Sequence, residues 1–585
     1  MQTGLSIAVL ASMVSFTGAH ELASEVRADT DAERLRKRAE RPGEEGSTQV
    51  RGTVGPGRQI AFLTGPDNAP CVRSLPDVTG DGLDEILVGI DESGTDNVFC
   101  LDGTSSGAAS IVWKIETAGG VSGGSPYGDQ CISAASDTDG NGAANVLLGT
   151  AWGGRTAYAL DGDAGATQWS FDTYLEPDSG WIYSIAEIGD VNGDGIPETA
   201  FGTGSMRDRV YLIDGASDAT QATVLWQFAA GDAVYSVRDI GDANGDGKHD
   251  VLAAVGDNGD RLVCLDGATT NPAGNVLWSY APGVSVYACG VLPDITGDGV
   301  NEALACLWVL GGSAVRCVNG ATGLVEWTST NVAQYAQMVD VLGDVTGDGI
   351  PEVIVSTWEN AVQVLSGADG SRVWKTSVGT VNGGDVWTAR AIDDLNGDGR
   401  QDVIAGSFDY HVYALDGDSG EIFWAYDTQN RVYSVHPVGD LDGDGWPEVA
   451  VGTQDTNNNV VFHLLDGNAD IPFPGITLIG NATLGAALAV EITGPAGSIA
   501  VPAYSSGTAS ATLAGITGTL GLASPIRFLR AGVIPAGGAY TLGGTVPLDP
   551  ALLGRTLYNQ GLAYTAPPLS GAFTDVEAVT FTEGD

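Results

Sequence analysis

Eight short loops of this chain carry oxygen-bearing side chains at alternate positions, which is the arrangement that a hard metal cation requires. Counted from its first residue, each loop has Asp at position 1, Thr, Asn or Asp at position 3, Asp or Asn at position 5, and Glu, Asp or Asn at position 9. Positions 4 and 6 are Gly in every copy, and Gly permits the sharp turn that brings these oxygens together. The pattern therefore predicts calcium sites, with a backbone carbonyl at position 7 completing each ligand set.

The predicted calcium ligands are the side chains at positions 1, 3, 5 and 9 of each loop: Asp77, Thr79, Asp81, Glu85; Asp137, Asp139, Asn141, Asn145; Asp190, Asn192, Asp194, Glu198; Asp242, Asn244, Asp246, Asp250; Asp294, Thr296, Asp298, Glu302; Asp344, Thr346, Asp348, Glu352; Asp394, Asn396, Asp398, Asp402; Asp440, Asp442, Asp444, Glu448. The second loop has only two carboxylates, so we expect it to bind calcium most weakly. The alternative is a set of acidic turns without metal, because Asp and Asn favour tight turns on their own. The loops are not EF-hands, since position 12 is apolar, as at Val88, and strands rather than helices are expected to follow.

The loops recur 46 to 60 residues apart, so the elements that position them must be repeated as well. The sequence pattern of each repeated unit predicts four short strands. The first leads into the acidic loop, an apolar second strand such as EILVGI follows it, and the third often ends in Asp-Gly. The fourth strand carries a Trp, which we expect to pack in the core: Trp113, Trp169, Trp226, Trp278, Trp327, Trp374 and Trp424. Four strands per unit at this period predict an all-β fold made of propeller blades.

The two ends of the repeat predict how the ring closes. The eighth unit contains Asp466 and Gly467, but the chain then continues as NADIPFPG without a Trp strand. Ahead of the first unit, QIAFLTGPDNAPCVRSLPD matches LWQFAAGDAVYSVRDIGD, so residues 58–64 correspond to the missing fourth strand. We therefore expect an eight-bladed β-propeller closed by an N-terminal strand, which leaves no exposed edge between the first and last blades.

Two motifs of the repeat are similar to those of known families. The acidic loops resemble the calcium-binding motif of integrin α-subunit propellers, the FG-GAP repeat. The segment ALDGDSGEIFW, from Ala414 to Trp424, resembles the tryptophan-docking motif of quinoprotein propellers, and ALDGDAGATQW, from Ala159 to Trp169, is a looser match. Together the resemblances cover residues 58–467 and imply a calcium-binding propeller. Neither implies a particular activity, because both motifs belong to the scaffold.

Aromatic residues recur at one further blade position, seven residues before the first Asp of the loop. If the loops lie on one face of the disc, these residues lie towards the other face, near the central channel. They could line a funnel in which a sugar or a peptide stacks, and the predicted ligand-binding residues are then Tyr183, Tyr235, Tyr287, Trp387 and Tyr433. The alternative is that they cap the inner strands and pack on one another. Three blades break the pattern, with Pro70, Gln130 and Gln337 at this position.

No set of catalytic residues is predicted. The five His residues are scattered, there is no Ser-His-Asp arrangement, and the regular acid pairs belong to the metal loops. The seven Cys residues recur at similar blade positions, which suggests disulfides in a secreted protein, and buried free thiols are the alternative. No Cys or His spacing suggests zinc. Some quinoprotein enzymes are expected to have two adjacent Cys residues, and no two Cys are adjacent in this chain.

The remaining sequence predicts further segments around the propeller, which we place at residues 57–467. An apolar run in MQTGLSIAVLASMVSFTGAHE predicts a signal peptide over residues 1–19, with a short membrane anchor as the alternative. Residues 20–56 are charged and form a linker or pro-segment, and residues 468–475 form a second linker. From residue 476 to 585, alternating apolar and polar residues with Gly and Pro turns predict a small C-terminal β-sandwich.

The formal net charge of −49 excludes binding of nucleic acid through a basic surface and predicts repulsion from anionic membranes. No later segment has about 18 uninterrupted apolar residues, so we expect no membrane insertion after signal removal. These features predict a secreted or cell-surface monomer that binds calcium and acts as a ligand-binding or cell-adhesion module for an extracellular glycan or protein. The alternative is a propeller enzyme that acts on polysaccharide or carries a quinone cofactor.

Overall fold

A computed structural model describes most of residues 59–467 and, beyond them, the strands within residues 476–580. The described residues are 59–65, 67–91, 96–121, 130–151, 153–175, 180–205, 208–218, 220–256, 259–309, 314–329, 332, 335–378, 384–396, 398–443, 445–454, 459–467, 476–480, 487–493, 499–506, 508–513, 516–522, 527–528, 532–533, 539–545, 556–565, 570–573 and 577–580. The predicted signal peptide, the segment 20–56, the linker 468–475 and the predicted ligand Asp444 lie outside them.

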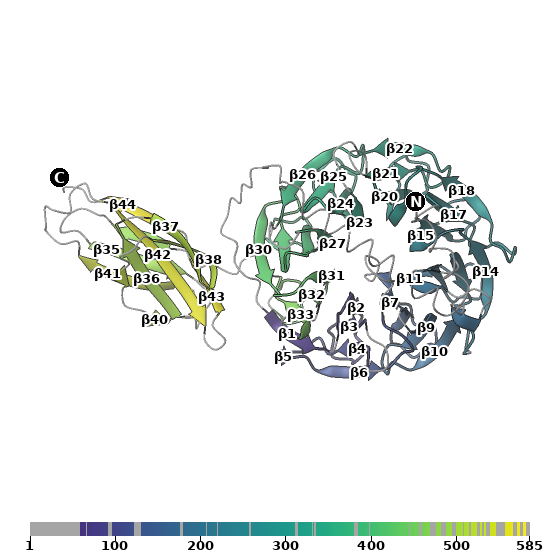
Figure 1. The fold of residues 1–585 in the computed structure, drawn as a ribbon, viewed down its shortest axis with the longest axis horizontal. Helices are drawn as coiled ribbons and strands as arrows, with labels where there is room; N and C mark the ends of the chain where they lie inside the picture. The colour runs from purple at the N-terminus through teal and green to yellow at the C-terminus, as the bar shows by residue number, and fades with distance from the viewer. Residues whose placement is uncertain are drawn as a thin grey trace, which may run out of the picture. The chain divides into compact units, whose positions relative to one another are not determined.

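Eight antiparallel sheets are arranged around a central axis as the blades of a propeller (Figure 1). The first strand of each blade is the innermost, and the others follow outwards in chain order, except that the outermost strand of blade 8 is the N-terminal β1. The strands of blades 1 to 4 are β2 (Cys71–Leu75), β3 (Glu85–Gly89), β4 (Val98–Leu101), β6 (Ile111–Ile115); β7 (Ile132–Ala135), β8 (Asn145–Gly149), β9 (Thr156–Asp161), β10 (Thr167–Asp172); β11 (Trp181–Ile188), β12 (Glu198–Gly204), β13 (Arg209–Ile213), β14 (Val224–Ala229); β15 (Val234–Gly241), β16 (Asp250–Val255), β17 (Arg261–Leu265), β18 (Val276–Tyr280). Those of blades 5 to 8 are β19 (Val286–Leu292), β20 (Glu302–Leu307), β21 (Val315–Val318), β22 (Val325–Thr328); β23 (Ala336–Leu342), β24 (Glu352–Thr357), β25 (Ala361–Leu365), β26 (Arg372–Ser377); β27 (Val386–Ile392), β28 (Asp402–Ser407), β29 (His411–Leu415), β30 (Ile422–Asp427); β31 (Val432–Pro437), β32 (Val449–Thr453), β33 (Val460–Leu465), β1 (Gln59–Thr64).

The burial of each strand follows its place in the blade. In blade 4 every residue of β16 is buried, because a second strand is covered by neighbouring blades on both faces. The outermost strand β18 is half-exposed: Val276 lies at the surface and Trp278 is buried. Continuous apolar segments therefore become second and third strands, and alternating segments become fourth strands.

The ring is closed by β1, as the sequence predicts. This strand pairs antiparallel with β33, which places Phe62 opposite His463 and Leu63 opposite Phe462. Ala61 and Leu63 are buried in one apolar cluster with residues of blades 1 and 8. A short strand between β4 and β6, β5 (Gly107–Ala108), adds to the other edge of β1 in parallel. The prediction of an eight-bladed propeller closed by an N-terminal strand is confirmed.

The Trp residues of the fourth strands join each blade to the next. Nε1 of Trp226 donates a hydrogen bond to the carbonyl oxygen of Gly267 at 3.0 Å, which fixes blade 3 to the Asp-Gly turn of blade 4. The same bond is made by five other pairs: Trp113–Gly162, Trp278–Gly320, Trp327–Gly367, Trp374–Gly417 and Trp424–Gly467. All seven Trp side chains are buried, so these residues belong to the core as expected.

All seven Cys residues are buried as free thiols, so the expectation of disulfides is wrong and the alternative is correct. Cys264 and Cys317 occupy equivalent third strands of blades 4 and 5. Packed sheets lie about 10 Å apart, which exceeds the distance of roughly 7 Å between Cα atoms that a disulfide can span.

The described part of residues 476–580 is made of two sheets. One contains β34 (Ile476–Gly480), β35 (Ala487–Thr493) and β41 (Ala539–Thr545). The other contains β36 (Ile499–Ser505), β37 (Thr508–Leu513), β38 (Ile516–Leu522), β39 (Arg527–Phe528), β40 (Gly532–Val533), β42 (Thr556–Thr565), β43 (Ser570–Phe573) and β44 (Glu577–Thr580). That the two sheets form a sandwich stays a prediction. A short 3-10 turn, η2 (Thr173–Leu175), precedes β11, and none of the described residues forms a helix long and apolar enough to cross a membrane.

Candidate functional site

Each acidic loop joins the first strand of a blade to its second, and the first Asp of the loop organises the turn. In blade 3 the carboxylate of Asp190 accepts the N–H of Gly193 at 2.6 Å and that of Gly195 at 3.1 Å. Both glycines have positive φ angles, 87° and 92°, which other residues adopt only with strain. These hydrogen bonds, led by that from Gly193, hold the pKa of Asp190 below its usual range.

The acid at position 9 lies at the buried end of the loop. Glu198 is fully buried, and its Oε2 accepts the N–H of Val191 at 2.7 Å. Its Oε1 is also buried and has no hydrogen-bond partner, as is true of Oε1 in Glu85 and Glu448. Burial first, and then the charges of Asp190 and Asp194, raise the pKa of Glu198 to about 7. A buried carboxylate oxygen without a partner is costly unless a cation or a proton compensates for it.

Four loops bring three carboxylates together, with ligand oxygens that all lie within 4.8 Å of one another. These clusters, the only such groups among the described residues, are Asp77–Asp81–Glu85, Asp190–Asp194–Glu198, Asp344–Asp348–Glu352 and Asp440–Asp442–Glu448. Three carboxylates close together, with an unpartnered buried oxygen of Glu85, Glu198 or Glu448 in three of the four clusters, match the chemistry that calcium requires. A divalent cation would offset both the desolvation and the mutual repulsion of these groups, so the residues fit the metal that the sequence predicts.

Loops with Asp at position 9 are arranged differently. The shorter side chain of Asp250 accepts the N–H of Ala243 on one oxygen, at 2.9 Å, and the N–H of Gly267 on the other, at 3.0 Å. Asp402 makes the equivalent pair of bonds, with Leu395 and Gly417. In both Asp250 and Asp402, each carboxylate oxygen thus accepts a backbone N–H. Among the described residues, neither of these two loops forms a three-carboxylate cluster.

The loop of blade 5 also departs from the pattern, although it has Glu at position 9. The carboxylate of Asp298 accepts a hydrogen bond from Nδ2 of Asn319 at 2.9 Å. Asn319 takes the place of the Asp in the Asp-Gly turn, so it supplies a donor where six other blades carry an acid. Glu302 accepts the N–H groups of Ile295 and Thr296. These bonds satisfy the acids of the loop without a cation.

In blade 2 a side-chain amide lies among the predicted ligands. Nε2 of Gln168, on β10, donates to Oδ2 of Asp139 at 3.0 Å and to Oδ1 of Asn145 at 2.9 Å. Nδ2 of Asn145 donates in turn to Thr138 at 2.6 Å, and Nδ2 of Asn141 donates to Asp161 at 2.9 Å. The amide of Gln168 therefore makes contacts that a cation would make in a metal-filled loop. That this loop binds calcium most weakly stays a prediction.

At the other end of the first strands lie the predicted ligand-binding aromatics, each at a β-bulge. The pairing of β11 with β12 skips Tyr183, and the same irregularity occurs at Tyr235, Tyr287, Gln337, Trp387 and Tyr433. A bulge leaves one residue unpaired and redirects its side chain. The recurring position seven residues before the loop is thus a recurring backbone irregularity on the face opposite the acidic loops.

Nine rings form a continuous series, which we call the aromatic arc: Tyr183, Tyr235, Tyr287, Trp308, Tyr335, Trp358, Trp387, Phe408 and Tyr433. Successive ring centroids lie 4.9 Å apart from Tyr235 to Tyr287, 4.5 Å from there to Trp308 and 4.0 Å from there to Tyr335. Of the five predicted residues, four are buried and Tyr433 is partly exposed, so the described geometry is that of rings packed on one another. Whether they also bind a ligand stays a prediction.

Tyr335 lies two residues before Gln337, in the blade that breaks the sequence pattern, and three further members of the arc were missed by sequence reasoning. Trp308, Trp358 and Phe408 each follow directly after a second strand, so aligning the ends of those strands would have found them. In blades 3 and 4 the equivalent residues are Gly204 and Gly256. A Cβ atom at these glycines would lie 2.2 Å from Tyr183 and 2.1 Å from Tyr235, respectively, so the tyrosine rings occupy that space instead.

Gln337 is the one polar residue at the bulge positions. Its side chain is 7% exposed, and neither Oε1 nor Nε2 has a hydrogen-bond partner. A buried amide without partners costs about 1–3 kcal/mol. The arc therefore combines flat apolar rings with one unsatisfied donor and acceptor.

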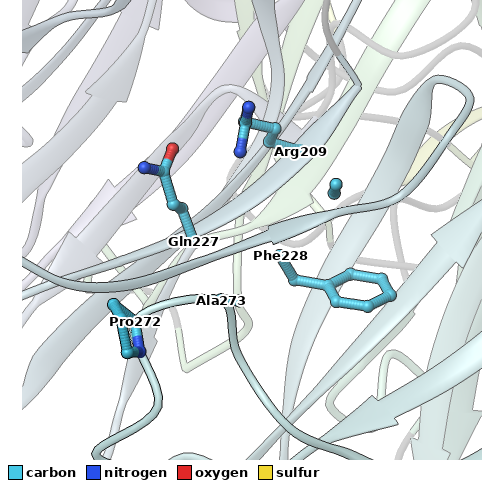
Figure 2. A pocket seen from close by; sticks show the side chains of 6 residues that line it. Arg209, Gln227, Phe228, Pro272 and Ala273 are labelled. Carbon is cyan, nitrogen blue, oxygen red and sulfur yellow. The ribbon is translucent and has the colours of Figure 1, made fainter.

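A shallow pocket of about 350 Å³ lies elsewhere, on the outer strands of blades 3 and 4. Figure 2 shows Arg209 and Phe228 on one side of it and the segment with Pro272 and Ala273 below. None of its lining residues belongs to an acidic loop or to the aromatic arc. We assign it no role in the candidate sites.

The fold and the loops define an all-β, eight-bladed propeller with repeated acidic turns, and comparison with protein families agrees with this class. Residues 190–253 match the model of the FG-GAP-like repeat, which confirms the resemblance seen in the sequence. Residues 352–468 match the model of the lambda-carrageenase beta-propeller domain. No curated protein matches the chain.

Solved propeller structures are similar to this chain at low sequence identity. Sqt1 from Saccharomyces cerevisiae has a TM-score of 0.50 and 12% identity, over 70% of this chain and 99% of that one. The C-terminal WD40 domain of Sif2 has a TM-score of 0.49 and 13% identity, over 71% and 99% of the two chains. BamB from Moraxella catarrhalis has a TM-score of 0.43 and 15% identity, over 70% and 97%. At such identity the match to Sqt1 shows the fold alone.

Proposed function

We propose that this protein is a secreted propeller, loaded with calcium on one face, that binds an extracellular glycan on the other. The observation that carries the proposal is the set of four three-carboxylate clusters, each containing a fully buried Glu, such as Glu198 and Glu448. Calcium bound there would neutralise part of the formal charge of −49 and fix the turn between the first and second strands. Metal that binds only the folded state also stabilises it by mass action.

The glycan part of the proposal rests on the aromatic arc. Trp308, Tyr335 and Tyr433 are partly exposed, and Gln337 offers an amide without partners. Flat rings with a few placed polar groups suit the binding of sugars, whose faces are apolar and whose edges carry hydroxyl groups. The match of residues 352–468 to a propeller domain named for a carrageenase supports a polysaccharide as the ligand. A propeller enzyme that acts on polysaccharide or carries a quinone remains the alternative.

Elemental analysis of protein never exposed to chelator tests the calcium part. We expect at least four calcium ions per chain, and up to eight if every loop is filled. A content of no more than one or two ions would contradict the proposal. The four clusters should retain their ions longest during dialysis against a chelator, because their acids are already assembled.

A glycan array probed with and without calcium tests the ligand part. Gln337→Leu should weaken binding of any glycan found by about tenfold, equivalent to one hydrogen bond of 1.4 kcal/mol. The same change should leave the stability equal or higher, because it removes unsatisfied polar atoms from a buried position. Gln227→Leu, in the outer pocket, is the matched control. No glycan binding under either condition, or equal binding by both variants, would refute the assignment of the arc.

A further inference from the structure

The acidic loops of blades 3 and 4 meet at a basic side chain. Lys248 is the seventh residue of the blade-4 loop, and its Nζ donates to the backbone carbonyl oxygen of Asp190, in the blade-3 loop, at 2.9 Å. The same Nζ lies 3.8 Å from Oδ1 of Asp190. At position 7, six of the eight loops carry an apolar residue: Leu83, Ala143, Ile196, Val300, Ile350 and Trp446. The ammonium group of blade 4 therefore lies beside the three-carboxylate cluster of blade 3.

The residue after Lys248 packs against the start of the blade-3 loop. Nδ1 of His249 lies 2.7 Å from Oδ2 of Asp239, and this oxygen also accepts the N–H of Gly189 at 3.1 Å. A Cβ atom at Gly189 would lie 2.7 Å from the ring of His249, so only Gly permits this close approach. These contacts hold the blade-4 loop next to the blade-3 loop, and Lys248 is held there with it.

The other basic residue at position 7 is Arg400, in the blade-7 loop. Its Nη1 forms an ion pair with Oδ2 of Asp418 at 2.6 Å. Asp418 is not a predicted calcium ligand, so it offsets the charge of Arg400 without taking a carboxylate from a loop. Among the described residues, Lys248 forms its ion pair with Asp190, which is itself a predicted ligand. Lys248 therefore competes directly with a metal ion for one carboxylate.

We propose that Lys248 sets the calcium affinity of the blade-3 cluster and makes it the weakest of the four three-carboxylate clusters, an inference that rests on the proposed binding of calcium. The ammonium group would repel an ion held by Asp190, Asp194 and Glu198. The side chains of Lys248 and Asp190 are 33% and 30% exposed, so solvent screens part of this repulsion. We expect an affinity about tenfold below that of the three-carboxylate clusters of blades 1 and 6. The blade-3 loop then fills last of the four as the calcium concentration rises.

Equilibrium dialysis of the full chain at a series of buffered calcium concentrations, with elemental analysis of the bound calcium, tests the role of Lys248. Lys248→Met removes the ammonium group and should move one binding step to about tenfold lower free calcium. Lys248→Gln keeps a side-chain donor without the charge and should give the same shift, whereas Lys248→Arg keeps the charge and should retain the wild-type isotherm. The control is Lys114→Met, on β6 of blade 1, where Lys114 pairs with Asp96 at 2.5 Å. This control should also bind calcium as the wild type does.

Glu198→Gln assigns the shifted step to blade 3. This change removes a carboxylate from the blade-3 cluster, so adding Lys248→Met to it should no longer shift any binding step. Unchanged or weaker calcium binding by Lys248→Met alone would overturn the inference and show that the lysine only fixes the shape of the loop. A shift that persists in the Glu198→Gln background would overturn it as well. If the wild type binds no more than one or two ions at any calcium concentration, the proposed calcium binding itself fails, and the two failures are thus told apart.

Discussion

Acid should weaken the closing seam of the propeller through one buried histidine. His463, on β33, is 2% exposed, and its Nδ1 donates to Oε1 of Gln59, on the closing strand β1, at 2.8 Å. The same oxygen accepts the hydroxyl of Tyr426 at 2.8 Å. Burial lowers the pKa of His463 from 6.5 to about 3, because the charged imidazolium would lose its hydration there.

The sign of the effect follows from proton uptake. Below pH 6.5 the unfolded chain binds a proton at His463, whereas the folded chain does not bind it until the pH approaches 3. The free energy of unfolding therefore falls as the pH decreases through this window. One pH unit corresponds to about 1.4 kcal/mol, so the contribution of His463 should fall by about 2 kcal/mol between pH 8 and pH 5.

Urea unfolding followed by tryptophan fluorescence, in excess calcium at pH 8, 7, 6 and 5, measures this loss against His463→Gln. The advantage of the wild type over the variant should shrink by about 2 kcal/mol from pH 8 to pH 5. His411→Gln should show the opposite pH dependence. Burial opposes protonation of His411, but the carboxylate of Asp409 outweighs burial and raises the pKa of His411. The stability of the wild type relative to His411→Gln should therefore grow as the pH falls. A constant gap between wild type and His463→Gln at every pH would refute the reasoning.

Four further predictions concern the loops and the joints between blades. Glu198→Gln should remove one tightly held calcium ion and lower the melting temperature measured in calcium, because it deletes a carboxylate from a complete cluster; an unchanged metal content by elemental analysis would contradict this. Gln168→Glu should add an ion, since it replaces an amide donor beside two ligand oxygens with a carboxylate, and the same ion content as the wild type would count against the assigned role of the amide. Trp226→Phe should cost about 2 kcal/mol in urea unfolding, because it shrinks a buried side chain and leaves the carbonyl oxygen of Gly267 unpaired; a loss below 0.5 kcal/mol would argue against the joint. Deletion of residues 1–56 should leave a soluble propeller. Deletion of residues 1–66 removes β1 and exposes strand edges, so it should cause aggregation that light scattering detects. Equal solubility of the two deletion variants would refute closure by β1.

The sequence by itself determined the elements of this protein that depend on local pattern. A loop such as Asp190 to Glu198 is organised by hydrogen bonds between residues three, five and seven apart, so its turn is fixed within a window of nine residues. The Trp strands and the Asp-Gly turns repeat with that loop, and the period of the repeat predicts the blades. Closure by β1 was also predictable, because the eighth unit lacks the one strand that the N-terminus supplies.

Only the tertiary structure decided which loops assemble three carboxylates. Position 9 is acidic in seven loops, yet the outcome depends on groups from other parts of the blade. The N–H of Gly267 donates a hydrogen bond to the second carboxylate oxygen of Asp250. The side-chain amide of Asn319 donates to Asp298, and that of Gln168 donates to Asp139 in the loop of blade 2. In blades 4 and 7 the shorter Asp at position 9 accepts backbone N–H groups on both oxygens, whereas the Glu of four other loops remains in a cluster. Such contacts are not visible in the pattern.

The aromatic arc shows the same division. The recurrence of Tyr and Trp before the loop was visible in the sequence, but the bulge that redirects these side chains is a property of strand pairing. Trp308, Trp358 and Phe408 come from the ends of different strands and meet the arc only because the blades pack around a common axis. The free thiols of Cys264 and Cys317 follow from the same geometry, since these two equivalent positions of the repeat are separated by the thickness of a blade. Local pattern thus specifies what each blade contains, while contacts between strands and between blades decide which side chains meet.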